Sequence, residues 1–104
     1  MKTVTEQINE MISDSDAILF MKGTKEMPMC GFSSTVVKIL IHYNVEFKTI
    51  NILEDPNIRI ELSKHSNWPT IPQLFVNGEL IGGCDIVMEL HNSGELQEVL
   101  KKIN

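Results

Sequence analysis

The sequence predicts an α/β protein built on a four-stranded mixed sheet flanked by about five helices. Residues 17–51 run from an apolar segment through a helical period into a second strand. Such a strand–helix–strand unit pairs its strands in parallel through a right-handed crossover. Residues 73–81 hold two short apolar runs joined by Asn77-Gly78, which is typical of an antiparallel hairpin. The 104 residues, 42% of them hydrophobic, suffice for one compact domain over residues 1–104.

Most of the expected helices are predicted by apolar residues at helical spacing or by capping residues, and the strands are predicted by short apolar or alternating runs. In chain order we expect a helix over 3–12, a strand over 17–21, a helix over 31–43, a strand over 46–51, a helix over 56–64, strands over 73–76 and 79–81, a helix from about 84, and a helix over 95–102. The first helix carries Val4, Ile8, Met11 and Ile12 on one side. Gly94 separates the last two helices.

The run Cys30-Gly31-Phe32-Ser33 lies at the predicted junction between the first strand, a loop over 22–29 and the second helix. Unpaired N–H groups and the positive dipole end of a helix N-terminus favour a thiolate there, and Lys22 is the cation best placed to help. Ser33 stands where a redox pair keeps its second thiol, so Cys30 can attack but cannot resolve a disulfide within the motif. The alternative is a buried, inert cysteine.

Composition narrows the classes of partner. The net charge of −5 argues against nucleic-acid binding, and no segment resembles a membrane span or a signal peptide. Two cysteines without an export signal indicate free thiols in a reducing compartment. An acidic N-terminal segment disfavours a transit peptide. We therefore expect the protein to reside in a bacterial cytoplasm, and the alternative is a processed form in an organellar matrix.

Four motifs, in the same order and at the same spacing, resemble the signature set of monothiol glutaredoxins of the single-domain class. They are Lys22-Gly23-Thr24, Cys30-Gly31-Phe32-Ser33, Trp68-Pro69-Thr70-Ile71-Pro72-Gln73 and Gly82-Gly83-Cys84-Asp85. The resemblance covers almost the whole chain. It implies a thioredoxin fold, a glutathione site and a role in handling iron–sulfur clusters.

The resemblance also implies roles for single residues. Cys30 matches the thiolate that ligates iron or forms a mixed disulfide with glutathione. Lys22 matches the lysine that faces the glutathione glycine carboxylate, and Arg59 resembles a second clamp on that carboxylate. For both cations the alternative is an ordinary solvated side chain.

The later motifs complete the implied glutathione site. Ile71 matches the residue before a cis proline, whose N–H and C=O pair with the backbone of the glutathione cysteine. The alternative there is a trans proline that ends a loop. The N–H groups of Cys84 and Asp85 resemble the pocket for the γ-glutamyl carboxylate, and Asp85 suits the γ-glutamyl ammonium or acts as a plain helix cap.

Several other residues could in principle react or bind a metal, but we expect them to have structural roles. Cys84 either resolves a glutathione mixed disulfide or shapes the pocket, and we favour the second role. For Trp68 we favour packing in the core, with a partner-facing role as the alternative. Met27 and Met29 are expected to make hydrophobic contacts along the loop rather than bind a soft metal. The histidines and cysteines form no zinc pattern.

A count of ligands gives the expected mechanism. A [2Fe–2S] cluster usually takes four thiolates, whereas one chain offers Cys30 and one bound glutathione offers a second. We expect a homodimer that bridges one cluster and passes it to apo iron–sulfur acceptors, with a BolA-type protein as a further partner of the family. The alternative is a glutathione-dependent thiol–disulfide oxidoreductase. For this activity the resemblance implies weak turnover at most, because the loop between Lys22 and Cys30 is longer than in dithiol glutaredoxins.

Overall fold

The computed structural model describes residues 2–103 and confirms the α/β fold. The elements are α1 (Val4–Ser13), β1 (Ala17–Met21), α2 (Gly31–His42), β2 (Lys48–Asn51), α3 (Pro56–Ser66), β3 (Gln73–Val76), β4 (Glu79–Gly82), α4 (Cys84–Ser93) and α5 (Glu95–Leu100). The sheet order is β2-β1-β3-β4. The β1–β2 pair is parallel, and the other two pairs are antiparallel.

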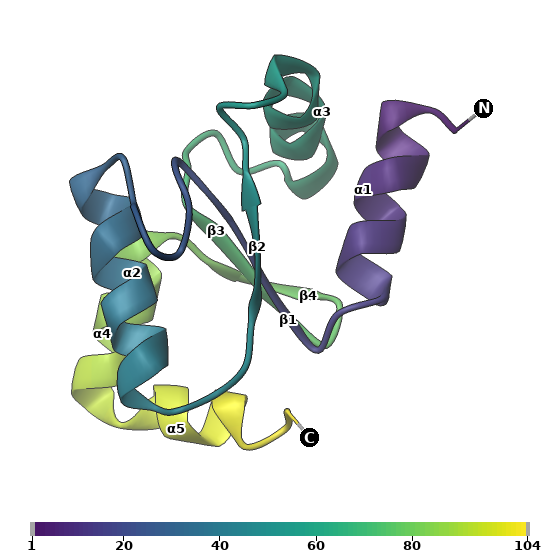
Figure 1. The fold of residues 1–104 in the computed structure, drawn as a ribbon. Helices are drawn as coiled ribbons and strands as arrows, with labels where there is room; N and C mark the ends of the chain where they lie inside the picture. The colour runs from purple at the N-terminus through teal and green to yellow at the C-terminus, as the bar shows by residue number, and fades with distance from the viewer. Residues whose placement is uncertain (1, 104) are drawn as a thin grey trace.

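The helices cover both faces of the sheet (Figure 1). Helices α1 and α3 lie on one side, and α2, α4 and α5 lie on the other. All five residues of β1 are buried because this strand is central and has a helical layer on each face. Alternate β1 side chains enter different cores: Leu19 packs with the α2, α4 and α5 residues, and Phe20 packs with the α1 and α3 residues.

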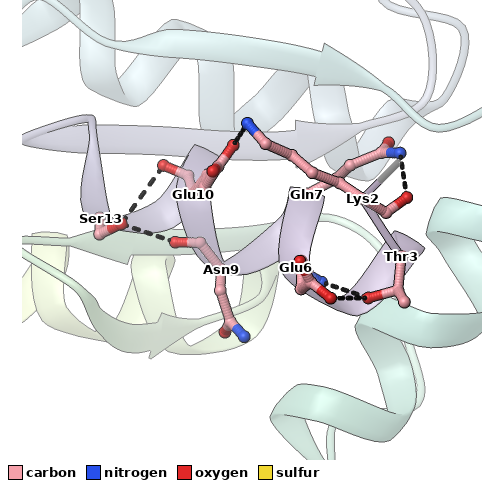
Figure 2. Close-up of polar contacts among 7 residues, drawn as sticks. All are labelled: Lys2, Thr3, Glu6, Gln7, Asn9, Glu10 and Ser13. Atoms are coloured by element: carbon pink, nitrogen blue, oxygen red, sulfur yellow. Dashed lines mark hydrogen bonds and ion pairs between the residues drawn. The ribbon is translucent and has the colours of Figure 1, made fainter.

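Helix α1 is stabilised at its N-terminus and along its exposed side (Figure 2). The Thr3 hydroxyl accepts a hydrogen bond from the Glu6 N–H at 3.1 Å, which satisfies one of the unpaired donors of the first turn. Lys2 and Glu10 form an ion pair at 2.6 Å between exposed side chains. The opposite side of the helix buries Ile8 and Ile12 against the sheet.

Three element ends differ from the sequence-based expectation by two residues, whereas the ends of α1, α2 and β4 differ by one. Strand β2 begins at Lys48 rather than at residue 46, and the Phe47 carbonyl just before it accepts a hydrogen bond from Lys25 Nζ at 3.0 Å. Helix α3 continues to Ser66 and ends where Asn67 turns left-handed at φ 56°. Helix α5 ends at Leu100, two residues early, and the chain continues in tight turns.

The topology brings four chain segments to one end of the sheet. The carboxyl ends of β1 and β2 meet there because these strands are parallel. Strand β3 begins at the same end, with Gln73 opposite Phe20, and β4 finishes there, with Gly82 opposite Leu74. Helices α2 and α4 therefore both begin at this end. None of the helices within residues 2–103 is both long and apolar enough to cross a membrane.

Candidate functional site

A pocket of about 190 Å³ lies at this end of the sheet. The residues of three predicted motifs line it together with their neighbours: Phe32, Trp68, Thr70, Ile71, Pro72, Gly83, Cys84, Asp85 and Ile86. A larger hollow of about 480 Å³, lined in part by Lys25, Glu46 and Lys48, includes none of the predicted site residues. The pocket at the helix N-termini is therefore the candidate site.

Cys30 occupies the N-cap position of α2, in an extended conformation and only partly buried. The backbone N–H of Ser33 is the main cause that lowers the pKa of the Cys30 thiol, and it outweighs the opposing effect of partial burial. The N–H of Phe32 and the Ser33 hydroxyl lower this pKa further, whereas the charge of Lys22 has the smallest effect. The helix terminus, more than the lysine, therefore favours the thiolate, and the alternative of a buried, inert Cys30 is wrong.

Ser33 is fully buried and joins two parts of the site. Its hydroxyl oxygen accepts a hydrogen bond from the Lys22 N–H at 3.2 Å, and the same hydroxyl helps to lower the pKa of the Cys30 thiol. Ser33 thus joins the end of β1 to the first turn of α2 as well as replacing a second cysteine.

The loop over residues 22–29 is ordered by main-chain and side-chain hydrogen bonds. The Met29 N–H donates to the Lys22 carbonyl at 2.9 Å, and the Gly23 N–H donates to Asn51 Oδ1 at 2.9 Å. Thr24 and Met27 exchange a pair of main-chain bonds at 3.1 Å. Met27 and Met29 are 69% and 63% exposed, so any hydrophobic contact along the loop covers only the smaller part of each residue.

The peptide bond between Ile71 and Pro72 is cis, as expected, and the alternative of a trans proline is wrong. Gln73 is fully buried behind this bond, and its side-chain amide donates to the carbonyls of Trp68 at 2.9 Å and Thr70 at 3.1 Å. Trp68 does not lie in the core. It lines the pocket half-buried, and its buried indole N–H has no partner within residues 2–103.

The N-terminus of α4 forms the other wall of the pocket. Gly83 is its N-cap, and a Cβ atom there would lie 3.0 Å from the Pro72 carbonyl oxygen and 3.3 Å from the Trp68 indole nitrogen. No side chain caps this helix among the residues that the structure describes, so its first N–H groups are open to a ligand. Asp85 is exposed in the first turn.

Cys84 is 8% exposed, and burial raises the pKa of its thiol, with smaller contributions from the charges of Asp85 and Cys30. Its sulfur lies 3.7 Å from Met88 Sδ. These properties fit a residue that shapes the pocket better than a nucleophile. The two thiols of the chain therefore differ: Cys30 is accessible and acidified, and Cys84 is covered.

Lys22 and Arg59 lie outside the pocket lining, on the loop after β1 and in the first half of α3. Both side chains are partly exposed, and neither forms an ion pair with any residue between 2 and 103. Across the same described range, no group of three or more His, Cys, Asp or Glu side chains could hold a metal ion.

Sequence reasoning missed the roles of Asn51 and Gln73, whose side chains hydrogen-bond to the main chain of other segments. Both are polar residues at the end of a strand, which is the signal that could have drawn attention to them. Their partners lie on other segments, however, and become visible only in the folded chain.

Known proteins resemble this chain over most of its length. The family model described as glutaredoxin matches residues 17–81. A probable monothiol glutaredoxin 2 of Rickettsia typhi is 58% identical over 94 residues, which cover 90% of this chain and 85% of the relative. Glutaredoxin 4 of Escherichia coli K12 is 47% identical over 102 residues, which cover 98% and 89%.

Two solved structures show the same fold. The solution structure of reduced poplar apo GrxS14 has a TM-score of 0.83 at 48% identity, and the match covers 93% of this chain and 89% of that one. The crystal structure of a buckwheat glutaredoxin–glutathione complex has a TM-score of 0.86 at 26% identity, covering 96% and 89%.

Proposed function

Because this chain belongs to the glutaredoxin family, we propose that it binds glutathione and carries a [2Fe–2S] cluster between two copies of itself for delivery to acceptor proteins. The observation that carries the proposal is the contrast between its two thiols. Cys30 is accessible with a lowered pKa, Ser33 occupies the resolving position, and Cys84 is covered with a raised pKa.

Glutathione binding is supported by complementary chemistry around the pocket. The open N–H groups at the start of α4 suit the γ-glutamyl carboxylate, and the exposed Asp85 suits its ammonium. The main chain of Ile71 borders the pocket and suits the extended backbone of the glutathione cysteine. The buckwheat relative, whose complex with glutathione has been solved, shares this fold.

The glycine end of glutathione is assigned to Lys22 and Arg59, two of the cations that form no ion pair in residues 2–103. The charge of Lys22 acts on the Cys30 thiol, so a carboxylate beside that thiol can meet it, and a guanidinium can bind a carboxylate with two hydrogen bonds. In this arrangement the thiol of bound glutathione lies beside Cys30.

The cluster is treated as cargo, and its ligands are counted from the chain. A [2Fe–2S] cluster takes four thiolates as a rule, and Cys30 is the one accessible, acidified cysteine within the described residues. Bound glutathione supplies a second thiolate for each chain, so two chains reach four. Ligands that are not covalently attached can leave, which suits transfer to an acceptor.

We extend the proposal to the cellular setting. The chain acts as one glutaredoxin domain in a bacterial cytoplasm, with an organellar matrix as the alternative. Its two free cysteines suit a reducing compartment, and close relatives come from Rickettsia and Escherichia. Apo iron–sulfur proteins, or a BolA-type protein that shares the cluster, are its partners.

The test is anaerobic reconstitution with ferrous iron, a sulfide source and glutathione. Cys30→Ser is expected to leave the protein colourless and without bound iron. Cys84→Ser, the matched control at the other cysteine, is expected to keep the visible absorption. Omission of glutathione is expected to prevent assembly. Iron content in Cys30→Ser equal to that of the unmodified chain would refute the assignment.

A second candidate function is supported by the acidified Cys30 thiol, which suits attack on a glutathione mixed disulfide. In that reaction the Cys30 thiolate attacks the mixed disulfide, takes over the glutathionyl group and releases the substrate thiol. A second glutathione then attacks the Cys30–glutathione disulfide, which restores the Cys30 thiol and forms glutathione disulfide. Rapid turnover of a glutathionylated peptide with little bound iron would favour this enzyme over the carrier.

A further inference from the structure

Asn51 lies at the carboxyl end of β2 and pairs with Met21, the last residue of β1. Its side-chain oxygen accepts two main-chain hydrogen bonds, from the Gly23 N–H at 2.9 Å and from the Leu53 N–H at 3.0 Å. One oxygen therefore joins the turn after β2 to the loop that leads to Cys30. The link spans 28 positions of sequence.

The main chain at Lys22 and Gly23 is held from three directions. The Lys22 N–H donates to the Ser33 hydroxyl of α2 at 3.2 Å. The Lys22 carbonyl accepts from the Met29 N–H of the same loop at 2.9 Å. Asn51 adds the third contact, at the Gly23 N–H. The start of the Lys22 side chain is fixed by α2, the loop and the end of β2 together.

Among the residues of this loop junction, Gly23 has the backbone with the greatest intrinsic conformational freedom. It is buried, adopts φ +91° and has no Cβ, so its backbone can take more conformations than that of any other residue type. Without the Asn51 oxygen its N–H would lose the hydrogen bond that fixes it, and a buried donor left unpaired is costly. The backbone would then reorient, and the Lys22 side chain would point in a different direction.

The chemistry of the acceptor also matters. The amide oxygen of Asn51 is neutral, so it can hold the backbone beside Lys22 without offering that ammonium an ion-pair partner. An aspartate could accept the same two bonds, but its charge would compete with the carboxylate of a ligand for Lys22.

We propose that Asn51 is a positioning residue that holds Lys22 where its ammonium meets the glycine carboxylate of glutathione, and so sets the preference of the site for a tripeptide with a free C-terminus. The inference rests on the proposed function. Asn51 acts through the main chain of Gly23 and need not touch the ligand.

The first test compares the affinity of the reduced protein for glutathione and for its glycine ethyl ester by chemical-shift titration. The ester lacks the charge that Lys22 would meet. The unmodified chain is expected to prefer the free acid by about fivefold, the upper range for a solvent-exposed ion pair. In Asn51→Ala this preference is expected to fall to the share that Arg59 alone supplies.

Thr3→Ala is the matched control, because it also removes one side-chain acceptor from a main-chain N–H, but on α1 and away from the pocket. It is expected to keep the fivefold preference. Equal loss in both variants, or an unchanged preference in Asn51→Ala, would overturn the inference. If the unmodified chain itself shows no preference, the failure lies with the proposed roles of Lys22 and Arg59.

Amide hydrogen exchange gives a readout that does not depend on the ligand. The Gly23 amide is expected to exchange at least tenfold faster in Asn51→Ala, whereas Asn51→Asp, which keeps the acceptor, is expected to protect it as in the unmodified chain. Fast exchange in Asn51→Asp would show that the side-chain oxygen is not what holds Gly23, and would overturn the inference even if Asn51→Ala fails to fold.

Discussion

Gly23→Ala is the substitution whose effect follows most directly from the geometry of the loop. The new Cβ would lie 2.5 Å from two main-chain atoms, the Met27 oxygen and the Met29 nitrogen. Main-chain atoms cannot swing away as the end of a flexible side chain can. The residue also adopts φ +91°, which L-residues rarely do.

The cost can be separated into two parts. The left-handed backbone costs an alanine about 1–2 kcal/mol. Forcing an extra methyl group into occupied space typically adds about 1–3 kcal/mol. We therefore expect Gly23→Ala to lower the free energy of unfolding by about 2–5 kcal/mol, which for a chain of this size corresponds to a drop in Tm of about 10 °C or more.

Two other glycines provide matched controls. Gly78 adopts φ +84°, but a Cβ there would meet no atom within 4 Å, so Gly78→Ala isolates the backbone part, about 1–2 kcal/mol. Gly31 lies at the start of α2 with no such φ and no neighbour within 4 Å, so Gly31→Ala is expected to be neutral or to stabilise by about 0.5–1 kcal/mol.

The assay is urea unfolding followed by the fluorescence of Trp68, the sole tryptophan of the chain. The expected order of stability is Gly31→Ala, then Gly78→Ala, then Gly23→Ala. The same variants are then titrated with glutathione, and only Gly23→Ala is expected to lose affinity beyond the effect of unfolding. A Gly23→Ala protein as stable as Gly78→Ala would refute the argument from close backbone contact.

Four further outcomes are expected. Because the pKa of Cys30 is lowered, its alkylation by iodoacetamide should rise with pH and reach half its maximum at a lower pH than for an ordinary cysteine, whereas Cys84 should react slowly throughout; peptide mass spectrometry would contradict this if the two rates were alike. Ser33→Ala should slow Cys30 alkylation at pH 7, because the Ser33 hydroxyl helps to lower the pKa of that thiol, and an unchanged rate would argue against this effect. Arg59→Ala should weaken glutathione binding by up to about fivefold at low salt and less at high salt, as calorimetry can measure. Phe20→Ala should lower the free energy of unfolding in urea by about 3–5 kcal/mol, because Phe20 is fully buried and packs edge-on against Phe75, with 5.8 Å between the ring centroids.

Much of the fold could be predicted because its signals are local. The apolar run 17–21 and the Asn77-Gly78 turn each depend on neighbours in sequence, and both elements form where expected. The start of β2 could not be predicted in the same way. Phe47, the residue just before this strand, accepts a hydrogen bond from Lys25, which lies 22 positions away, and that contact exists only once the loop has folded.

The candidate site shows the same division. The placement of Cys30 at the start of a helix follows from the order of strand, loop and helix, and the structure has it there. The links made by Asn51 and Gln73 depend on which strand ends meet, so periodicity could not reveal them. Trp68, for which the core was favoured over a partner-facing position, lines the pocket, where a large amphipathic ring can serve as a wall.

Native mass spectrometry of the anaerobically reconstituted protein tests the central claim most directly, because it counts chains, glutathione, iron and sulfide in one species. We predict two chains with two glutathione molecules and one [2Fe–2S] cluster, and a return to single chains when the cluster is removed. A cluster held by one chain, or a dimer that keeps its cluster without glutathione, would contradict the account.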